Sequence, residues 1–341
     1  MTRRKKDISD KPASEIFNCK NFQTDITSIR TAADFATVLL FQLTEVNVPD
    51  KTEQGLSALT QPLSFLPEHL SRAILKHIHQ CIHYEPTIGV MGKTGVGKSS
   101  LCNTLFNPPP AKVSAIKGCT RRVQTYQLAL APHALLIVDF PGIGETPELD
   151  RLYTRLYQHW LSQLDLIIWV LKADDRAWND DIRCYRQLIS QGADPVRFLF
   201  VLNQADKIEP CREWDLVTHQ PSLRQQQHLQ VKIAQVNALF SPQHAVLAVS
   251  ASEGFNMLLW AETFIRALPD NASSAVTRQL ESGYRTENVI KTARDNFARG
   301  VGDIFDDALS AMQTTGALVR QLKRLRHRLL SVVHAVWHFL F

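Results

Sequence analysis

The feature that most constrains this chain is the octapeptide at residues 92–99, Gly-Lys-Thr-Gly-Val-Gly-Lys-Ser, which matches the pattern G-x-x-x-x-G-K-[ST] in full. An apolar run at 87–91 precedes it, and a segment of helical character at 98–106 follows it. Glycines at this spacing let the backbone curl so that successive N–H groups point inward at phosphate oxygens. The N-terminus of the following helix adds a partial positive charge. The segment therefore predicts a phosphate-binding loop between a strand and a helix.

The side chains of this loop have expected tasks. Lys98 is predicted to neutralise the β- and γ-phosphates of a nucleoside triphosphate, and the Ser99 hydroxyl is predicted to ligate Mg²⁺. The other predicted nucleotide-binding residues of the loop are Gly92, Lys93, Thr94, Gly95, Val96, Gly97 and Ser100.

Short apolar runs alternate with helical segments through the middle of the chain. The runs cover residues 87–91, 123–130, 134–140, 166–171, 198–202 and 245–249. Strands that alternate with helices predict an α/β fold in which helices cover both faces of a mostly parallel sheet, giving three layers. Only a short link joins the second run to the third, too short for a crossover, so these two strands are expected to pair antiparallel.

Changes of texture along the sequence divide it into four parts. We expect a disordered basic N-terminus at 1–20, an N-terminal helical region at 21–85, the α/β domain at 86–270 and a C-terminal helical region at 271–341. Apolar residues recur at helical spacing in both helical regions. We therefore expect these regions to pack on each other or on the α/β domain.

Composition excludes several classes of protein. The net charge is only +5, so sequence-specific DNA binding is not expected. The six cysteines are scattered without metal-ligand spacing, which argues against a disulfide framework or a zinc site and favours a reducing compartment. No run reaches the roughly 18 apolar residues that span a bilayer. We therefore expect a cytoplasmic protein.

A second motif, Asp139-Phe140-Pro141-Gly142, lies at the end of the third apolar run. There Asp139 can hold Mg²⁺ through a water molecule, and the Gly142 N–H can meet the γ-phosphate. In the segment before it, Thr120 is the preferred candidate to reach Mg²⁺ and the γ-phosphate, with Thr125 as the alternative. The predicted catalytic residues are therefore Lys98, Thr120 and Gly142, and the predicted metal ligands are Ser99, Thr120 and Asp139.

Two further segments point to the base. Asn203-Gln204-Ala205-Asp206 follows an apolar run and is similar to the N-K-x-D motif of GTPases, with Gln204 in place of the lysine. The Asp206 carboxylate can accept two hydrogen bonds from guanine, whereas adenine presents no such donor pair. Ser250-Ala251 resembles the loop whose backbone N–H contacts the guanine O6. We therefore expect GTP and GDP as ligands, bound by Asn203, Gln204, Asp206, Ser250 and Ala251.

These motifs together carry a family resemblance. Residues 87–268 resemble the Era/MMR-type P-loop GTPases, a group known as 50S-ribosome-binding GTPases that includes small prophage-encoded YfjP-like proteins. The wording of the loop is also similar to that of septins and immunity-related GTPases, and the latter enclose a G domain between N- and C-terminal helices. The resemblance implies a six-stranded sheet with one antiparallel strand, Mg²⁺, and a switch between GTP and GDP.

Two departures from the family bear on hydrolysis. The position after D-x-x-G, where related proteins carry a water-orienting glutamine, is Ile143. The asparagine that K⁺-dependent members carry is replaced by Gly95. We therefore expect slow, Mg²⁺-dependent GTP hydrolysis, accelerated by a partner or by a homodimer formed through the G domain, with Lys93 as a candidate donor. The alternatives are a non-hydrolysing GTP-binding scaffold and a membrane-associated GTPase of the dynamin or immunity-related kind.

The C-terminal segment leaves two readings open. Residues 317–328 are basic and amphipathic, and Leu329–Phe341 is largely apolar. Such a segment can lie on an anionic membrane surface, or its apolar half can pack against the N-terminal helices, which we favour. The expected partners are therefore GTP, a second copy of the chain, and the ribosome or an anionic membrane surface.

Overall fold

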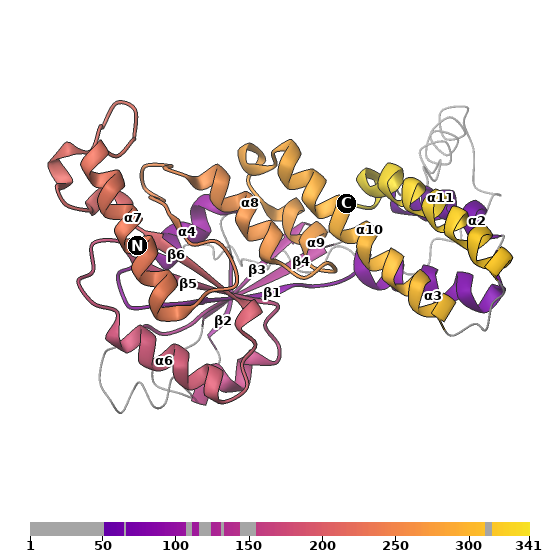
Figure 1. The fold of residues 1–341 in the computed structure, drawn as a ribbon, viewed down its shortest axis with the longest axis horizontal. Helices are drawn as coiled ribbons and strands as arrows, with labels where there is room; N and C mark the ends of the chain where they lie inside the picture. Colours follow the sequence, from indigo (N-terminus) through magenta and orange to yellow (C-terminus); the bar gives the residue numbers. More distant parts are fainter. Residues whose placement is uncertain are drawn as a thin grey trace, which may run out of the picture. The chain divides into compact units, whose positions relative to one another are not determined.

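The computed structural model describes residues 51–64, 66–106, 111–115, 124–130, 133–143, 155–310 and 316–341. Within these residues, seven strands form one sheet in the order β2-β3-β4-β1-β5-β6-β7 (Figure 1). The strands are β1 (Thr87–Met91), β2 (Ala111–Ala115), β3 (Gln124–Leu130), β4 (His133–Asp139), β5 (Leu166–Lys172), β6 (Phe198–Asn203) and β7 (Leu247–Ala248). β3 is antiparallel to its neighbours β2 and β4, and the other pairs are parallel.

The α/β fold and the antiparallel pairing of β3 with β4 are confirmed, but the sheet has one strand more than expected. The additional strand, β2, reads Ala-Lys-Val-Ser-Ala. It carries a single β-branched apolar residue, so its own pattern gives no strand signal. Its place in the sheet comes from pairing with β3, with a register shift between Lys112 and Ser114.

Helices cover both faces of the sheet. Residues of α4 (Lys98–Leu105) and α8 (Met257–Ala267) share one apolar cluster with alternate residues of β5 and β6, among them Ile168. Residues of α6 (Asn179–Ser190) and α7 (Leu223–Phe240) share a second cluster with the intervening residues, among them Trp169. Because both faces are covered, β5 is apolar almost throughout. The predicted nucleotide-binding residues that the structure describes lie at or just after the carboxyl ends of β1, β4, β6 and β7.

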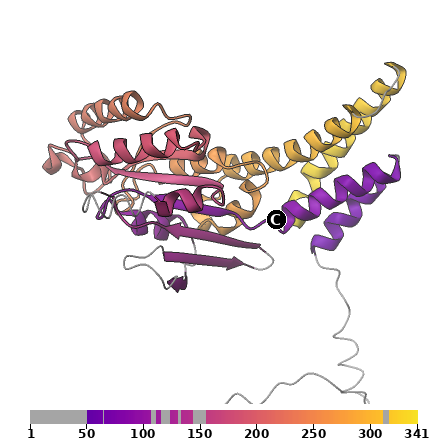
Figure 2. The same cartoon turned by 90° about the horizontal axis from the view of Figure 1, so that it is seen from below.

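Four helices outside the sheet form a helical bundle. They are α2 (Lys51–Leu63), α3 (Glu68–Ile82), α10 (Glu287–Ser310) and α11 (Gly316–Leu340). α2 lies beside α11, and α10 packs on both α3 and α11 (Figures 1 and 2). Gly55 permits the close approach of α2, because a Cβ at this position would overlap the Leu340 side chain. The predictions for residues 1–50 lie outside the described residues.

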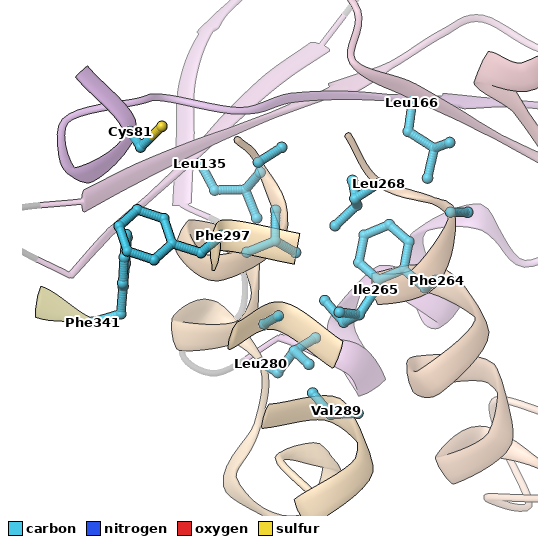
Figure 3. Packing of buried hydrophobic residues seen from close by; sticks show 14 of the residues in the cluster. Cys81, Leu135, Leu166, Phe264, Ile265, Leu268, Leu280, Val289, Phe297 and Phe341 are labelled. Atoms are coloured by element: carbon cyan, nitrogen blue, oxygen red, sulfur yellow. The ribbon is translucent and has the colours of Figure 1, made fainter. Parts of the chain in front are cut away.

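One face of the apolar half of α11 is buried, and α11 lies against α2, which confirms the packing alternative for these residues. Leu329 and Val333 are fully covered. The Trp337 Nε1–H donates to Ser274 Oγ at 2.9 Å, and Phe341 meets Phe297 edge-on with ring centroids 5.1 Å apart (Figure 3). No helix among the described residues combines the length and the apolar character that crossing a membrane requires.

A short segment between α9 (Ser273–Gln279) and α10 joins the bundle to the sheet. Leu280 forms an antiparallel bridge with Phe106, directly after α4. The Glu281 N–H donates to the Leu105 carbonyl at 2.9 Å. Leu280 is buried in one cluster with Phe264 of α8, with Leu268 directly after α8, and with Val289 of α10 (Figure 3). One continuous apolar core therefore extends from α4 into the helical bundle.

Candidate nucleotide-binding site

The loop between β1 and α4 depends on glycine at its two ends. Gly92 and Gly97 adopt φ values of +133° and +89°, in the region that side chains rarely enter. A Cβ at Gly92 would overlap the Val170 carbonyl oxygen, and a Cβ at Gly97 would overlap the Asn203 side-chain amide. The loop therefore lies tightly against the ends of β5 and β6.

Lys98 folds back over this loop. Its Nζ donates to the carbonyl oxygens of Gly92 at 3.1 Å and Lys93 at 3.2 Å. These contacts hold the ammonium group against the loop, at the N-terminus of α4. Ser99 and Ser100, in the first turn of α4, are exposed. This end of α4 can receive an anion, since its charge and N–H dipoles favour a phosphate group.

Asp139 lies opposite Lys98 at the carboxyl end of β4, in register with Val90 of β1. Asp139, Lys98 and Ser99 line one cavity of about 230 Å³. Asp139 Oδ1 is buried and has no hydrogen-bond partner among the described residues. Burial raises the pKa of this carboxyl group, and the nearby Lys98 acts in the opposite direction. An orphaned carboxylate oxygen beside a hydroxyl is the oxygen donor set that Mg²⁺ prefers, so the residues fit this ion.

The segment after Asp139 is pinned against the loop. Gly142 lies so close to Thr94 that a Cβ would overlap its backbone nitrogen. The Tyr157 hydroxyl donates to the Pro141 carbonyl at 2.6 Å. Ile143 is only 4% exposed and packs in the same apolar cluster as Tyr157. Its side chain therefore points into the core and cannot orient a water molecule.

Asn203 connects the phosphate-binding loop to the base-binding loop. It is 1% exposed. Its Nδ2 donates to the Val96 carbonyl at 2.9 Å, and its Oδ1 accepts from the Ala251 N–H at 3.2 Å. The resemblance of Ser250-Ala251 implies that a backbone N–H of this loop contacts the guanine O6. In the structure, the Ala251 N–H donates to Asn203.

The predicted base-recognising carboxylate, Asp206, is oriented by Ser250. The Ser250 hydroxyl is fully buried and donates to Asp206 Oδ1 at 2.6 Å. The sequence predicted only a backbone contact from the Ser250-Ala251 loop, and this use of the Ser250 hydroxyl was missed. The signal was present, because a serine follows a buried strand at the same sheet edge as Asp206.

Gln204, which replaces the motif lysine, lies along the phosphate-binding loop. It adopts a left-handed conformation with φ +60°. Its Nε2 donates to the Gly95 carbonyl at 2.8 Å, and its Oε1 accepts from Lys207 at 3.2 Å. The amide therefore gives the loop a hydrogen-bond donor at the position where a lysine would stand.

The side chain of one predicted residue, Lys93, is directed away from the cavity that Lys98 and Asp139 line. Lys93 Nζ is directed toward the turn after β5, where it donates to the Ala177 carbonyl at 3.3 Å and pairs with Asp181 at 3.5 Å. Sequence reasoning missed Asp181, for which no local pattern gives a signal. Thr120 lies outside the described residues, and its alternative, Thr125, is a buried residue within β3.

Comparison with known proteins places the chain in a family. A family model described as a 50S ribosome-binding GTPase matches residues 87–204. Two uncharacterized proteins of Escherichia coli K12 are similar over most of their length. YfjP is 41% identical over 292 residues, which cover 85% of this chain and 100% of YfjP. YkfA is 39% identical over 289 residues, which cover 84% of this chain and 99% of YkfA.

Among solved structures, a crystal structure of Era with MgGDPNP and nucleotides of 16S ribosomal RNA aligns with 54% of this chain and 57% of its own. Its sequence identity is 21% and its TM-score is 0.40. With the phosphate-binding loop, the D-x-x-G segment and the Asn203–Asp206 motif at one edge of the sheet, and with full-length similarity to YfjP, the chain belongs to the GTP-binding P-loop GTPases of the 50S ribosome-binding family.

Proposed function

We propose that this protein binds GTP with Mg²⁺, hydrolyses it to GDP and phosphate, and uses the two nucleotide states as a conformational switch. The observation that carries this proposal is the Asp206 carboxylate, held in place by the buried Ser250 hydroxyl. Guanine offers it the N1–H and the exocyclic amine. Adenine offers no such pair and would leave a partly buried carboxylate unsatisfied.

At the other end of the site, the chain's own residues would bind the phosphates. The loop N–H groups and Lys98 would hold the β- and γ-phosphates, and the Gly142 N–H would contact the γ-phosphate. Ser99, Thr120 and, through water, Asp139 would hold Mg²⁺. When bound, the ion supplies positive charge to the phosphate oxygens. The reaction is in-line attack of water on the γ-phosphorus, with GDP as the leaving group.

A second candidate function is a GTP-binding scaffold that does not hydrolyse the nucleotide. The burial of Ile143 favours it, because this side chain cannot orient the attacking water. If instead a second copy of the chain supplies the missing group, the single-turnover rate constant of phosphate release should rise with protein concentration. A measurable rate that does not change with concentration would contradict activation by dimerisation, and no release at any concentration would favour the scaffold.

An anionic partner surface is a further expectation. Lys323, Arg324, His327 and Arg328 are exposed on α11. Ribosomal RNA and anionic lipids share the chemistry that such residues attract. Co-sedimentation with ribosomes and flotation with anionic vesicles would separate these two partners.

The guanine proposal is tested by nucleotide titration calorimetry. We expect GTP to bind about 1,000-fold or more tightly than ATP, since the carboxylate discriminates by hydrogen bonding. Asp206→Asn should weaken GTP binding about 100-fold and favour xanthosine triphosphate, whose base presents the complementary pattern. Asp194→Asn, a matched change at an exposed carboxylate that caps a short 3₁₀ turn, should change nothing. Equal affinities of the unmodified protein for GTP and ATP would refute the proposal.

A further inference from the structure

The Lys93 side chain is held by oxygen atoms from the turn after β5 and from α6. Its Nζ lies 3.3 Å from the Ala177 carbonyl, 3.5 Å from Asp181 Oδ2 and 3.8 Å from Asp175 Oδ2. The Lys93 side chain is 23% exposed, whereas the Asp181 side chain is 1% exposed. The first variable residue of the phosphate-binding loop is therefore tied to a buried carboxylate.

Asp181 is itself fixed on two sides. Its Oδ1 accepts from the Trp169 Nε1–H of β5 at 3.0 Å, and it lies in the first turn of α6, where the N–H dipoles favour a negative charge. The turn is held from α7 as well. Lys232 Nζ donates to the Asp175 carbonyl at 2.5 Å and lies 4.9 Å from the centroid of the Trp178 ring. These contacts give the carboxylate a fixed position in the molecule.

The main chain of Lys93 reaches the phosphate site directly. Its carbonyl oxygen accepts a hydrogen bond from Lys98 Nζ at 3.2 Å. Gly142 lies against the peptide that joins Lys93 to Thr94. A displacement of Lys93 would therefore move both Lys98 and the segment expected to contact the γ-phosphate.

Stability alone does not account for this ion pair. Burial raises the pKa of the Asp181 carboxyl group, against the opposing effects of Trp169 and Lys93. The folded chain therefore disfavours the charged form, and buried ion pairs replaced by apolar residues are often neutral or stabilising. What the pair supplies at this place is a defined position for Lys93.

We propose that Asp181 is a positioning residue of the nucleotide site, which through Lys93 fixes the loop carbonyl that orients Lys98. This inference rests on the proposed GTP site and adds to it a residue that lies outside every nucleotide-binding motif of the chain. The γ-phosphate is the group that depends on Lys98 and Gly142 together. Loss of the Lys93–Asp181 ion pair should therefore weaken the binding of GTP more than that of GDP.

The test compares variants that remove the tie in two ways. Asp181→Asn keeps the size of the side chain and an acceptor for Trp169 but removes the charge that holds Lys93. The double variant Asp181→Asn/Lys93→Met removes the pair without leaving a buried charge uncompensated. Asp180→Asn is the matched control, because it removes a carboxylate from the same helix turn that pairs with Arg183 instead. For each protein we would measure the affinity for GDP and for GppNHp, a GTP analogue that is not hydrolysed. We would also measure the thermal midpoint and the single-turnover rate constant of phosphate release from GTP.

We expect the preference for GppNHp over GDP to fall about tenfold in both Asp181 variants, since small displacements in a phosphate site carry large effects. Asp180→Asn should resemble the parent in nucleotide preference, thermal midpoint and rate constant. If the two Asp181 variants lose thermal stability but keep the parent's nucleotide preference, the pair is only structural and the proposal is wrong. A parent protein that binds GTP without hydrolysing it would refute the proposed hydrolysis. The comparison of GppNHp and GDP affinities would still test the role of Asp181, because GppNHp binding needs no hydrolysis. A parent that binds no guanine nucleotide overturns both.

Discussion

The two ends of the nucleotide site are built differently. At the base end, Asn203 and Ser250 make hydrogen bonds within the chain, and Ser250 fixes the carboxylate of Asp206. At the phosphate end, Asp139 has a buried oxygen with no hydrogen-bond partner in the described part of the chain, and Lys98 donates to loop carbonyls. If the site binds GTP as proposed, its base end is preorganised for recognition, whereas its phosphate end presents the charge of Lys98 and a carboxylate oxygen to a ligand and an ion.

Removing the central charge of the phosphate end should have the largest effect. Lys98→Ala removes charge-assisted hydrogen bonds to the β- and γ-phosphates worth about 3 kcal/mol, so GTP affinity should fall about 100-fold by titration calorimetry. The fold should persist, because the replaced group is directed at the site. Lys291→Ala, at an exposed position of α10, is the matched control. Parent-like GTP binding by Lys98→Ala would place the phosphates elsewhere.

Removing the Asn203 side chain, which connects the two ends of the site, should have the second-largest effect. Asn203→Ala leaves the Val96 carbonyl and the Ala251 N–H without their buried partner. We expect a loss of about 2 kcal/mol in the free energy of unfolding, measured by urea denaturation, and weaker binding of both GTP and GDP. If only GTP binding weakened, Asn203 would serve the γ-phosphate rather than both ends of the site.

The smallest effect is expected for Asp139→Asn, which should stabilise the folded protein whereas Asn203→Ala should destabilise it. Because burial raises the pKa of this carboxyl group in the folded state, its contribution to stability is present at acid pH and is lost as pH rises through the folded pKa. Without nucleotide at pH 7, Asp139→Asn should therefore stabilise the protein by about 1 kcal/mol, which raises the thermal midpoint by about 1–2 °C.

The same experiment at lower pH provides the control for Asp139. The stability advantage of Asp139→Asn should shrink as the pH is lowered through the raised pKa of the parent carboxyl group, because that group then takes up its proton. Mg²⁺-dependent binding of GTP should weaken in the variant at pH 7. A variant less stable than its parent at neutral pH would show that Asp139 is satisfied within the folded chain.

The sequence predicted those parts of the site whose chemistry dictates residue types at fixed spacing. Phosphate binding needs glycines before Lys98, and guanine needs an acceptor such as Asp206, so both follow from local patterns. The pairing of Lys93 with Asp181 depends on tertiary placement, since the two residues lie on separate elements far apart in the chain. No periodicity or motif encodes such a contact.

The fold shows the same division. The apolar runs predicted every strand except β2, whose pairing with β3 is not written in its own five residues. The burial of α11 followed from the need of both helical regions for an apolar partner. Gln204 was predicted as a nucleotide-binding residue in place of a lysine. Its contact with the Gly95 carbonyl could not be predicted, because that contact requires the left-handed backbone that the structure shows.

The bridge between Phe106 and Leu280 has a consequence for dissecting the chain into fragments. A fragment that ended at residue 270 would retain every motif residue of the nucleotide site. It would nevertheless lose the Glu281 N–H that satisfies the Leu105 carbonyl, and it would expose Phe106, which is 2% exposed in the whole chain. The apolar surface uncovered at the C-terminal end of α4 would favour aggregation. We therefore expect the nucleotide-binding half to express in soluble form only together with the helices that follow it.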